Sequence, residues 1–309
     1  MAVTEALSEP PLEIEAAVAR GRFLRAVMRN RKAVIGAIIL FVMAFTAAFP
    51  GLIAPHSPTA ALYGQNSPPS GSHLLGTTQL GQDVFSQLVW STRLTLVVTL
   101  IVSAIATLIS TVVGVTAAYL GGAADRVLTV ITDIFLILPV LPLLILLATY
   151  LPPGPTSLVI VLCITSWAFQ ARQLRSQGLT VRNRDFLVAA RARGERSFYI
   201  ILVEIVPTMT SLLVASFLSL AVYVVGFAAT LQFLGLGNSG ELMWGTMLYN
   251  AQQASALEAG NAWWALAPGA AVALLGSGFA LLNYAFDEIG NPALRPVRRR
   301  RKRRDRASA

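Results

Sequence analysis

The chain has 309 residues, of which 55% are hydrophobic and only 13% are charged, and its formal net charge is +9. A soluble domain carries roughly 25% charged residues, so this composition excludes an ordinary soluble globular protein. Several apolar runs reach the ~18 residues that a helix needs to cross about 30 Å of hydrocarbon, and the alternating segments of a transmembrane barrel are absent. We therefore predict an all-α polytopic membrane protein.

The basic residues predict how this protein lies in the membrane. All 24 Lys and Arg residues fall at positions 20–32, 93, 126, 172–196 and 295–306. Basic residues accumulate on the cytoplasmic side of membrane proteins. The pattern therefore predicts six transmembrane helices with both termini in the cytoplasm. Only Arg93 is expected at the outer end of a span, where its side chain either extends to the membrane surface or pairs with Asp83.

The first third of the chain is expected to cross the membrane once and then remain outside. Residues 1–32 form a cytoplasmic arm, partly helical over Leu12–Met28, without the apolar core of a cleavable signal peptide. Residues 33–92 contain the first span, Ala33–Ile53, an extracytoplasmic loop, and an amphipathic helix within Gln79–Trp90 that lies along the outer surface.

Residues 93–290 are expected to form the transmembrane core, with a cytoplasmic loop at 172–206, and residues 291–309 a basic cytoplasmic tail. The tail is expected to contact anionic lipid of the bilayer rather than nucleic acid. Proline interrupts the third span and should bend it. The five further spans are predicted at Arg93–Leu120, Val127–Tyr150, Thr156–Gln170, Pro207–Leu234 and Trp263–Phe286.

Asp133 and Pro139 of the third span are candidates for a translocation path or gate. A carboxylate at mid-membrane costs roughly 2.5–3.5 kcal/mol on insertion scales, so an acidic residue in a span needs an explanation. Asp133 either faces the path or a neighbouring helix, or it reaches the inner interface. The sequence favours neither alternative.

Catalytic and metal-binding patterns are absent from the sequence. The two histidines, His56 and His73, are 17 residues apart, and Cys163 is the single cysteine. Such spacing gives little support to a metal site, so we predict none. The chain also lacks the G-x-S-x-G and P-loop motifs, so we predict no catalytic residues and no cofactor.

The stretch Asp185–Pro207 is the one long interior polar segment rich in arginine. Asp185 can cap a short helix, alanines give that helix a smooth face, arginines lie near its C-terminus, and a glycine permits a sharp exit. The segment is a candidate contact site for another protein, with the candidate residues Asp185, Phe186, Ala189, Ala190, Arg191, Arg193, Gly194 and Pro207.

This segment also carries a resemblance. Ala189-Ala190-Arg191-x-x-Gly194, followed by Ile205-Val206-Pro207, resembles the EAA loop of importer-type ABC permeases, whose first residue is Val188 here rather than Glu. Further ordered matches resemble elements of the dipeptide/oligopeptide permease family. They are His73-Leu-Leu-Gly-Thr77 with Leu80-Gly-Gln-Asp83, Arg93-Leu-Thr-Leu96, Asp133-Ile-x-Leu-x-Leu-Pro139, and Leu234-Gly-Leu-Gly237 with Trp244-Gly245.

The ordered set resembles the C-type subunit of a DppC/OppC-like importer, a binding-protein-dependent transport inner membrane component. The resemblance implies a MetI-like type I importer permease fold in the bacterial cytoplasmic membrane. It also implies that the 185–207 loop couples transport to ATPases. The outer segment is either a loop with an interfacial helix or a segment that dips towards the pore mouth and contacts the binding protein, and we favour the second. The candidate residues for that outer contact are Gly235, Gly237, Trp244 and Gly245.

The same resemblance implies the partners. They are a second homologous permease subunit, one or two cytoplasmic P-loop ATPases that bind ATP-Mg, and an extracytoplasmic peptide-binding protein. Peptides are the implied substrate, with nickel chelates, haem or glutathione as alternatives and an ion-coupled secondary carrier as a different class. Thr78 and Gln82 stand where the family has Asp and Arg, which makes an ion pair there doubtful.

Overall fold

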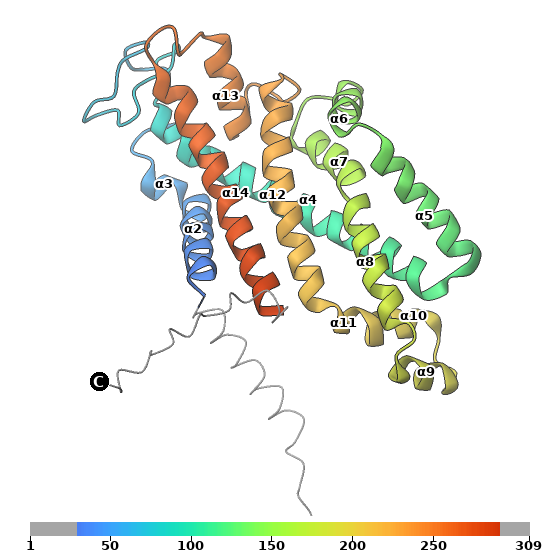
Figure 1. Cartoon of the computed structure of the whole chain (residues 1–309). Helices are drawn as coiled ribbons and strands as arrows, with labels where there is room; N and C mark the ends of the chain where they lie inside the picture. Colours follow the sequence, from blue (N-terminus) through green and yellow to red (C-terminus); the bar gives the residue numbers. More distant parts are fainter. Residues whose placement is uncertain (1–29, 291–309) are drawn as a thin grey trace, which may run out of the picture.

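The computed structural model describes residues 30–290, and every regular element of those residues is helical (Figure 1). The expected helix at Leu12–Met28 and the basic tail at 291–309 lie outside the described residues. In chain order the elements are α2 (Arg31–Ala48), α3 (Pro50–Ile53), α4 (Val84–Leu120), α5 (Gly122–Ile137), α6 (Val140–Thr149), α7 (Pro155–Ser166), α8 (Ala168–Val181), α9 (Asp185–Ala192), α10 (Ser197–Tyr199), the π-helix η1 (Ile200–Ile205), α11 (Val206–Thr208), α12 (Thr210–Phe233), α13 (Trp244–Gln253) and α14 (Ala262–Gly290).

Five segments of the described chain are long and apolar enough to cross a membrane: α2, α4, the α7–α8 run, α12 and α14. Helices α5 and α6 together pass the same test, but they meet at an angle of 90°. Counted as one bent span, they bring the total to six and confirm the predicted number. The protein is therefore a multi-pass membrane protein.

The bend between α5 and α6 has a local cause. Leu138 has ψ 132°, in the extended region, and Pro139 follows it as the N-cap of α6. A residue before proline is pushed out of the α region, and proline has no N–H to continue the helix. The predicted bend of the third span is thus present and lies at Leu138–Pro139.

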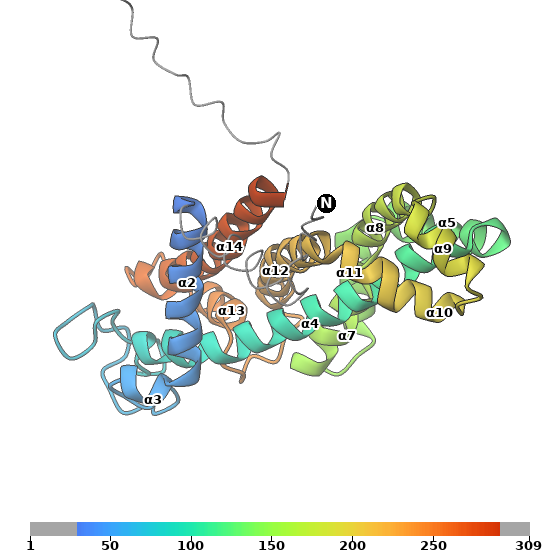
Figure 2. The same ribbon diagram turned by 90° about the horizontal axis from the view of Figure 1, so that it is seen from below.

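The second span differs from the prediction. The expected surface helix at Gln79–Trp90 is not a separate element, because α4 begins at Val84 and continues unbroken to Leu120. Its 37 residues extend about 55 Å at 1.5 Å per residue, more than the hydrocarbon thickness. No proline or glycine interrupts positions 84–96, so nothing ends the first helix there. Figure 2 shows α4 running along most of the molecule.

Small residues allow the helices to pack closely. A Cβ atom added at Gly114 of α4 would lie 2.4 Å from the Ala171 carbonyl oxygen of α8. One added at Gly36 of α2 would lie 2.8 Å from the Gly278 carbonyl oxygen of α14. Close approach at glycine is a common means of packing helices in membranes. These two contacts fix how α4 meets α8 and how α2 meets α14.

Different helices and loops lie at the two ends of the molecule (Figure 1). The start of α2, the end of α14 and the short helices α9 to α11 lie together at one end, and Asn30 donates a hydrogen bond to Glu288 there at 3.1 Å. The loop before α4 and helix α13 lie at the opposite end. With the basic clusters at 20–32 and 172–196, the first end is the cytoplasmic one.

Candidate functional site

Helix α9 presents the candidate coupling surface. Arg184 is its N-cap, in extended conformation, and makes no side-chain capping bond, so the predicted capping role of Asp185 is wrong. Asp185 is instead the first helical residue and is exposed. Its carboxylate still lies near the positive end of the helix dipole, which stabilises α9.

Gly194 ends this helix with a left-handed turn. Its φ is +77°, its N–H donates to the Arg191 carbonyl at 3.0 Å, and the Glu195 N–H donates to the Ala190 carbonyl at 3.3 Å. This pair of bonds is a Schellman motif, which satisfies carbonyls at the helix end. A Cβ atom at Gly194 would meet nothing within 4 Å, so only the backbone conformation favours glycine here.

The two faces of α9 differ. Leu187 and Ala190 are completely buried against the chain's own helices, in a cluster with Leu174 of α8 and Ile205 of η1. The predicted smooth alanine face is therefore incomplete, because Ala190 packs inward. The outer face carries the apolar side chains Phe186 and Val188, exposed by 39% and 52%. This outer face, with the exposed Ala189, is the part that another protein can contact.

Two arginines of this loop, Arg191 and Arg193, are held by the chain itself. The Arg191 guanidinium donates to the Arg182 carbonyl at 2.8 Å. Arg193 lies between the carboxylates of Glu195 and Glu204, with nitrogen–oxygen distances of 3.6 Å to each. These contacts tie the end of α9 to η1. Pro207, the last of the predicted residues, lies exposed in α11 beyond η1.

Asp133 of α5 forms an ion pair with Arg172 of α8. About two turns nearer the start of α5, the Asp125 carboxylate accepts two hydrogen bonds from Arg175, at 2.5 and 2.7 Å. Asp133 and both arginines line a cavity of about 280 Å³ between α4, α5 and α8. Of the alternatives left open by the sequence, the structure places Asp133 against a neighbouring helix. Pro139 is exposed at the α5–α6 bend, away from this pair.

We expect Asp125→Asn to lower the free energy of unfolding by about 2 kcal/mol, because the substitution removes a two-pronged charged contact and leaves Arg175 without its partner. Asp133→Asn serves as the matched control. The side chains of its pair are 42% and 57% exposed, so the expected loss is below about 1 kcal/mol. Thermal unfolding of the purified chain in detergent measures both losses, and equal losses would contradict the difference in burial.

Two of the four residues predicted to contact a binding protein, Trp244 and Gly245, are buried. Trp244 is 1% exposed, and its indole N–H donates to the Leu88 carbonyl at 3.1 Å. A Cβ atom at Gly245 would lie 2.3 Å from the Gln232 side-chain oxygen. Both residues therefore pack α13 against α4 and α12. Neither residue is at the surface in this structure.

The other two predicted contacts lie in the turn between α12 and α13. Gly235 is exposed with φ +82°, and Gly237 is half-buried. Nearby, burial raises the pKa of the Glu241 carboxyl above its usual range, while a hydrogen bond from Asn238 opposes this shift. Of the four candidate residues, only Gly235 and Gly237 therefore lie where an outer protein could reach them.

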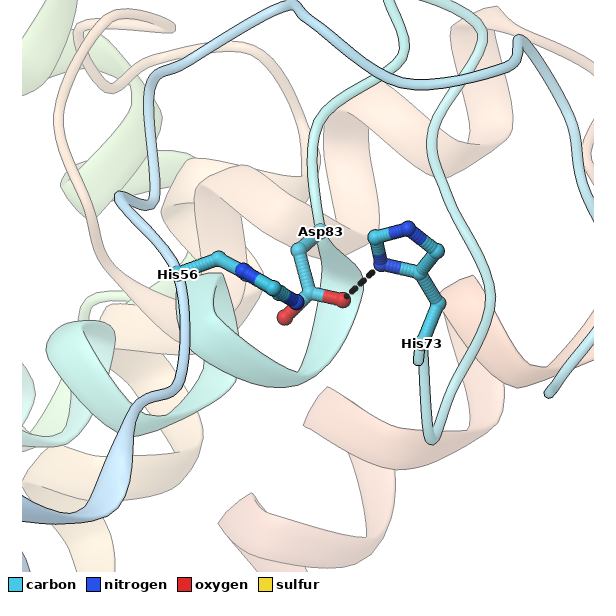
Figure 3. Close-up of side chains that lie close together, drawn as sticks. All are labelled: His56, His73 and Asp83. Carbon is cyan, nitrogen blue, oxygen red and sulfur yellow. Dashed lines mark hydrogen bonds and ion pairs between the residues drawn. The ribbon is translucent and has the colours of Figure 1, made fainter. Parts of the chain in front are cut away.

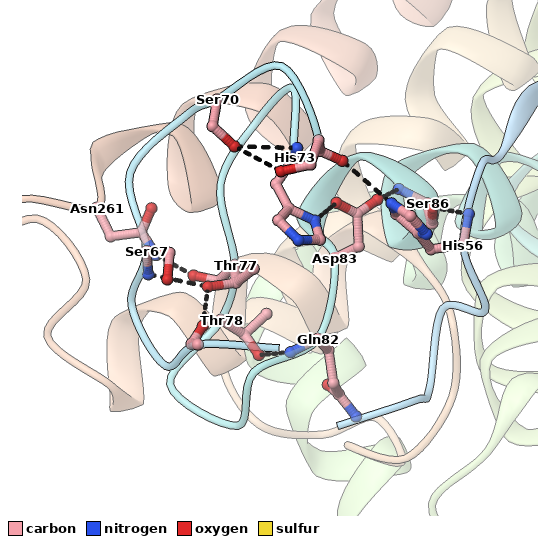
Figure 4. Close-up of polar contacts among 12 residues, drawn as sticks. His56, Ser67, Ser70, His73, Thr77, Thr78, Gln82, Asp83, Ser86 and Asn261 are labelled. Carbon is pink, nitrogen blue, oxygen red and sulfur yellow. Dashed lines mark hydrogen bonds and ion pairs between the residues drawn. The ribbon is translucent and has the colours of Figure 1, made fainter. Parts of the chain in front are cut away.

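The loop before α4 is held by neutral hydrogen bonds (Figure 4). The Thr78 hydroxyl accepts the backbone N–H groups of Leu80 and Gln82, both at 3.2 Å, and the Gln82 amide donates to the Thr59 carbonyl at 3.2 Å. No ion pair links positions 78 and 82 within the described chain. The Asn261 amide joins this loop to the start of α14 through the Thr77 carbonyl at 2.6 Å.

Asp83 ends the loop as the N-cap of α4. One carboxylate oxygen accepts the Ser86 backbone N–H at 2.8 Å, and the other contacts His73 Nδ1 at 2.9 Å. The Asp83 carboxylate therefore contacts His73 and Ser86 and does not pair with Arg93. His56 lies beside this pair, and one ligand atom from each of the three residues falls within 4.8 Å of the others. The sequence predicted no metal site, because its spacing argument does not detect this juxtaposition.

Comparisons with known proteins agree with this architecture. Residues 110–295 match the family described as binding-protein-dependent transport system inner membrane component, and residues 20–69 match the N-terminal transmembrane domain of oligopeptide transport permease C. A chain from inward-facing structures of the MetNI methionine ABC transporter matches with a TM-score of 0.52 at 20% identity, over 66% of this chain and 94% of that one. At this identity the match shows the fold alone, and it confirms the MetI-like permease fold.

Two curated relatives align along most of their length. The dipeptide transport system permease protein DppC of Bacillus subtilis is 30% identical over 276 residues, which are 88% of this chain and 85% of that protein. The probable D,D-dipeptide transport system permease protein DdpC of Escherichia coli is 32% identical over 263 residues, 84% and 87% of the two chains. The chain belongs to the family of binding-protein-dependent transport system inner membrane components, as a multi-pass DppC/OppC-like ABC permease of the cytoplasmic membrane.

Proposed function

We propose that this chain is one of two homologous membrane subunits of an ATP-driven peptide importer and forms half of its translocation path. The observation that carries the proposal is the exposed outer face of α9 at the cytoplasmic end, in a chain of the permease family. The names of the relatives, dipeptide and oligopeptide permeases, support peptides as the substrate class.

The chain itself performs no catalysis in this proposal. Its sequence contains no P-loop, so ATP and Mg²⁺ bind to one or two cytoplasmic ATPase subunits that contact the outer face of α9. Closure of the ATPases on ATP moves α9 and the spans packed against it, and the path opens outward. An extracytoplasmic binding protein then delivers peptide, and hydrolysis restores the inward-facing state.

The test is reconstitution. The chain is co-expressed with its genomic neighbours, purified through a tag on this chain alone, and placed in proteoliposomes with a labelled dipeptide and the binding protein. We expect a P-loop ATPase and a second permease chain to co-purify, and uptake to require ATP. Uptake that persists without ATP but is abolished by a protonophore would contradict the proposal and favour an ion-coupled carrier.

A further inference from the structure

Three potential metal ligands meet on the outer side of the membrane, at the start of α4. His56 follows α3, His73 lies in the loop between α3 and α4, and Asp83 caps α4. His73 Nδ1 is 2.9 Å from an Asp83 oxygen, and one ligand atom of each residue lies within 4.8 Å of the others. Figure 3 shows both imidazole side chains turned toward the carboxylate.

The surroundings of this cluster are partly buried and lack basic groups. The Asp83 side chain is completely buried and that of His73 is 13% exposed. The Tyr63 ring packs on both imidazoles, with centroid distances of 5.0 Å to His56 and 4.5 Å to His73. Residues 54–92 contain no Lys or Arg, so no side-chain ammonium or guanidinium of this outer segment neutralises the buried carboxylate.

We propose that His56, His73 and Asp83 form an extracytoplasmic binding site for a divalent transition-metal ion of the Zn²⁺ class. Imidazole nitrogen and carboxylate oxygen are the ligands that Zn²⁺ takes when sulfur is absent, and three protein ligands leave a position for water. Mg²⁺ prefers six oxygen ligands in octahedral geometry, so this set disfavours it.

Binding requires only local side-chain movement. Tetrahedral Zn²⁺ with ligand distances of 2.0–2.1 Å holds its ligand atoms about 3.3 Å apart, so the widest separation must shrink by roughly 1.5 Å. His56 Nε2 now contacts the Ser72 carbonyl at 3.0 Å, and the exposed face of this loop allows the ring to turn away from it. The ring protons of both histidines then reside on the nitrogens that face away from the ion.

The site would add a metal link between segments that are otherwise joined by hydrogen bonds and ring contacts. The irregular chain from 54 to 82 is held at its ends by α3 and α4 and within itself by several hydrogen bonds. One of the bonds to α4 runs from the His56 N–H to the Ser86 hydroxyl, 3.2 Å. A metal ion bound to residues 56, 73 and 83 closes two loops of this chain onto the N-terminus of α4. Because an ion that binds only the folded loop stabilises it, Zn²⁺ should raise the unfolding temperature.

The experiment uses the full chain with a histidine-free tag, since its own two histidines are then the only ones present. After chelator treatment, Zn²⁺ or Mg²⁺ is titrated calorimetrically, and zinc X-ray absorption reports the ligands. We expect one Zn²⁺ per chain with two imidazole ligands, no measurable Mg²⁺ binding, and an affinity that falls at least about tenfold in His56→Gln. The exposed loop variant Gln65→Ala is the matched control and should bind as the wild type does.

His56→Gln retains an amide N–H for the Ser72 carbonyl, so the loop should fold without the imidazole. Asp83→Asn likewise retains a residue favoured at the N-cap of α4 while it removes the charged ligand. Unfolding temperatures of these variants without Zn²⁺ show whether the substitutions impair folding. An unfolding temperature that rises with Zn²⁺ in the wild type but not in the variants supports the site. Zinc binding that is absent in the wild type, or equal in His56→Gln/His73→Ala, would overturn the proposal.

Discussion

Gly194→Pro is expected to reduce ATP-dependent uptake at least tenfold while the protein still inserts into the membrane. Proline fixes φ near −65°, whereas Gly194 has φ +77°, and its missing N–H removes the bond to the Arg191 carbonyl. The local cost of roughly 3 kcal/mol is enough to open the end of α9 and displace the exposed Phe186 and Val188. Uptake and stimulated ATP hydrolysis in proteoliposomes measure the loss.

Gly194→Ala is the matched control. Its Cβ atom meets nothing within 4 Å, so its cost is the left-handed backbone alone, about 1–2 kcal/mol. We expect most of the uptake to remain. Normal uptake and ATP hydrolysis in the proline variant would show that the conformation of α9 does not couple this chain to ATP hydrolysis. An equal loss of uptake in the alanine and proline variants would show the same.

Gly114→Ala should be the most destabilising single-methyl change in the membrane core. The added Cβ would lie 2.4 Å from the Ala171 carbonyl oxygen and 3.1 Å from the Arg175 backbone nitrogen. Backbone atoms cannot turn aside as a flexible side chain can, so α4 and α8 must separate. Overpacking of this kind costs about 1–3 kcal/mol, and here separation would also disturb the Asp125–Arg175 contact.

Gly226→Ala tests the same chemical change where space is available. Gly226 lies within α12, and a Cβ atom there would meet nothing within 4 Å. Because alanine favours helices more than glycine does, we expect unchanged or slightly higher stability. Unfolding of the purified chains in detergent compares the two variants. Similar unfolding midpoints would show that the α4–α8 contact does not depend on glycine.

The sequence predicted the membrane topology well because topology depends on local properties. Apolar run length and the positions of Lys and Arg determine how many helices cross and which loops stay inside. The bend at Pro139 and the exit at Gly194 were also predictable, since each depends on one residue's backbone preferences. The extent of α4 was not predictable, because the polar side chains at 79–90 suggest a helix on the outer surface, whereas Gln82 and Gln87 bond the outer loop.

Contacts between distant residues were harder to predict. Ala190 and Trp244 belong to short patterns that suggested surface roles, and only the folded chain shows that both are buried. The Asp125–Arg175 pair gave a partial signal, with acidic and basic residues near the same end of neighbouring spans. The meeting of His56, His73 and Asp83 gave none, because the loop path between them has no regular period.

The outer face of α9 is proposed to contact a cytoplasmic ATPase, and cross-linking tests this contact most directly. The Val188 side chain is 52% exposed, so a cysteine at this position should be accessible. Val188→Cys is made in a Cys163→Ala background, which removes the single native cysteine. We predict that a short cross-linker joins Val188→Cys to the ATPase, whereas Ser70→Cys in the outer loop forms no such product. Labelling of Val188→Cys by a membrane-impermeant maleimide from outside intact cells, with no ATPase cross-link, would contradict the account.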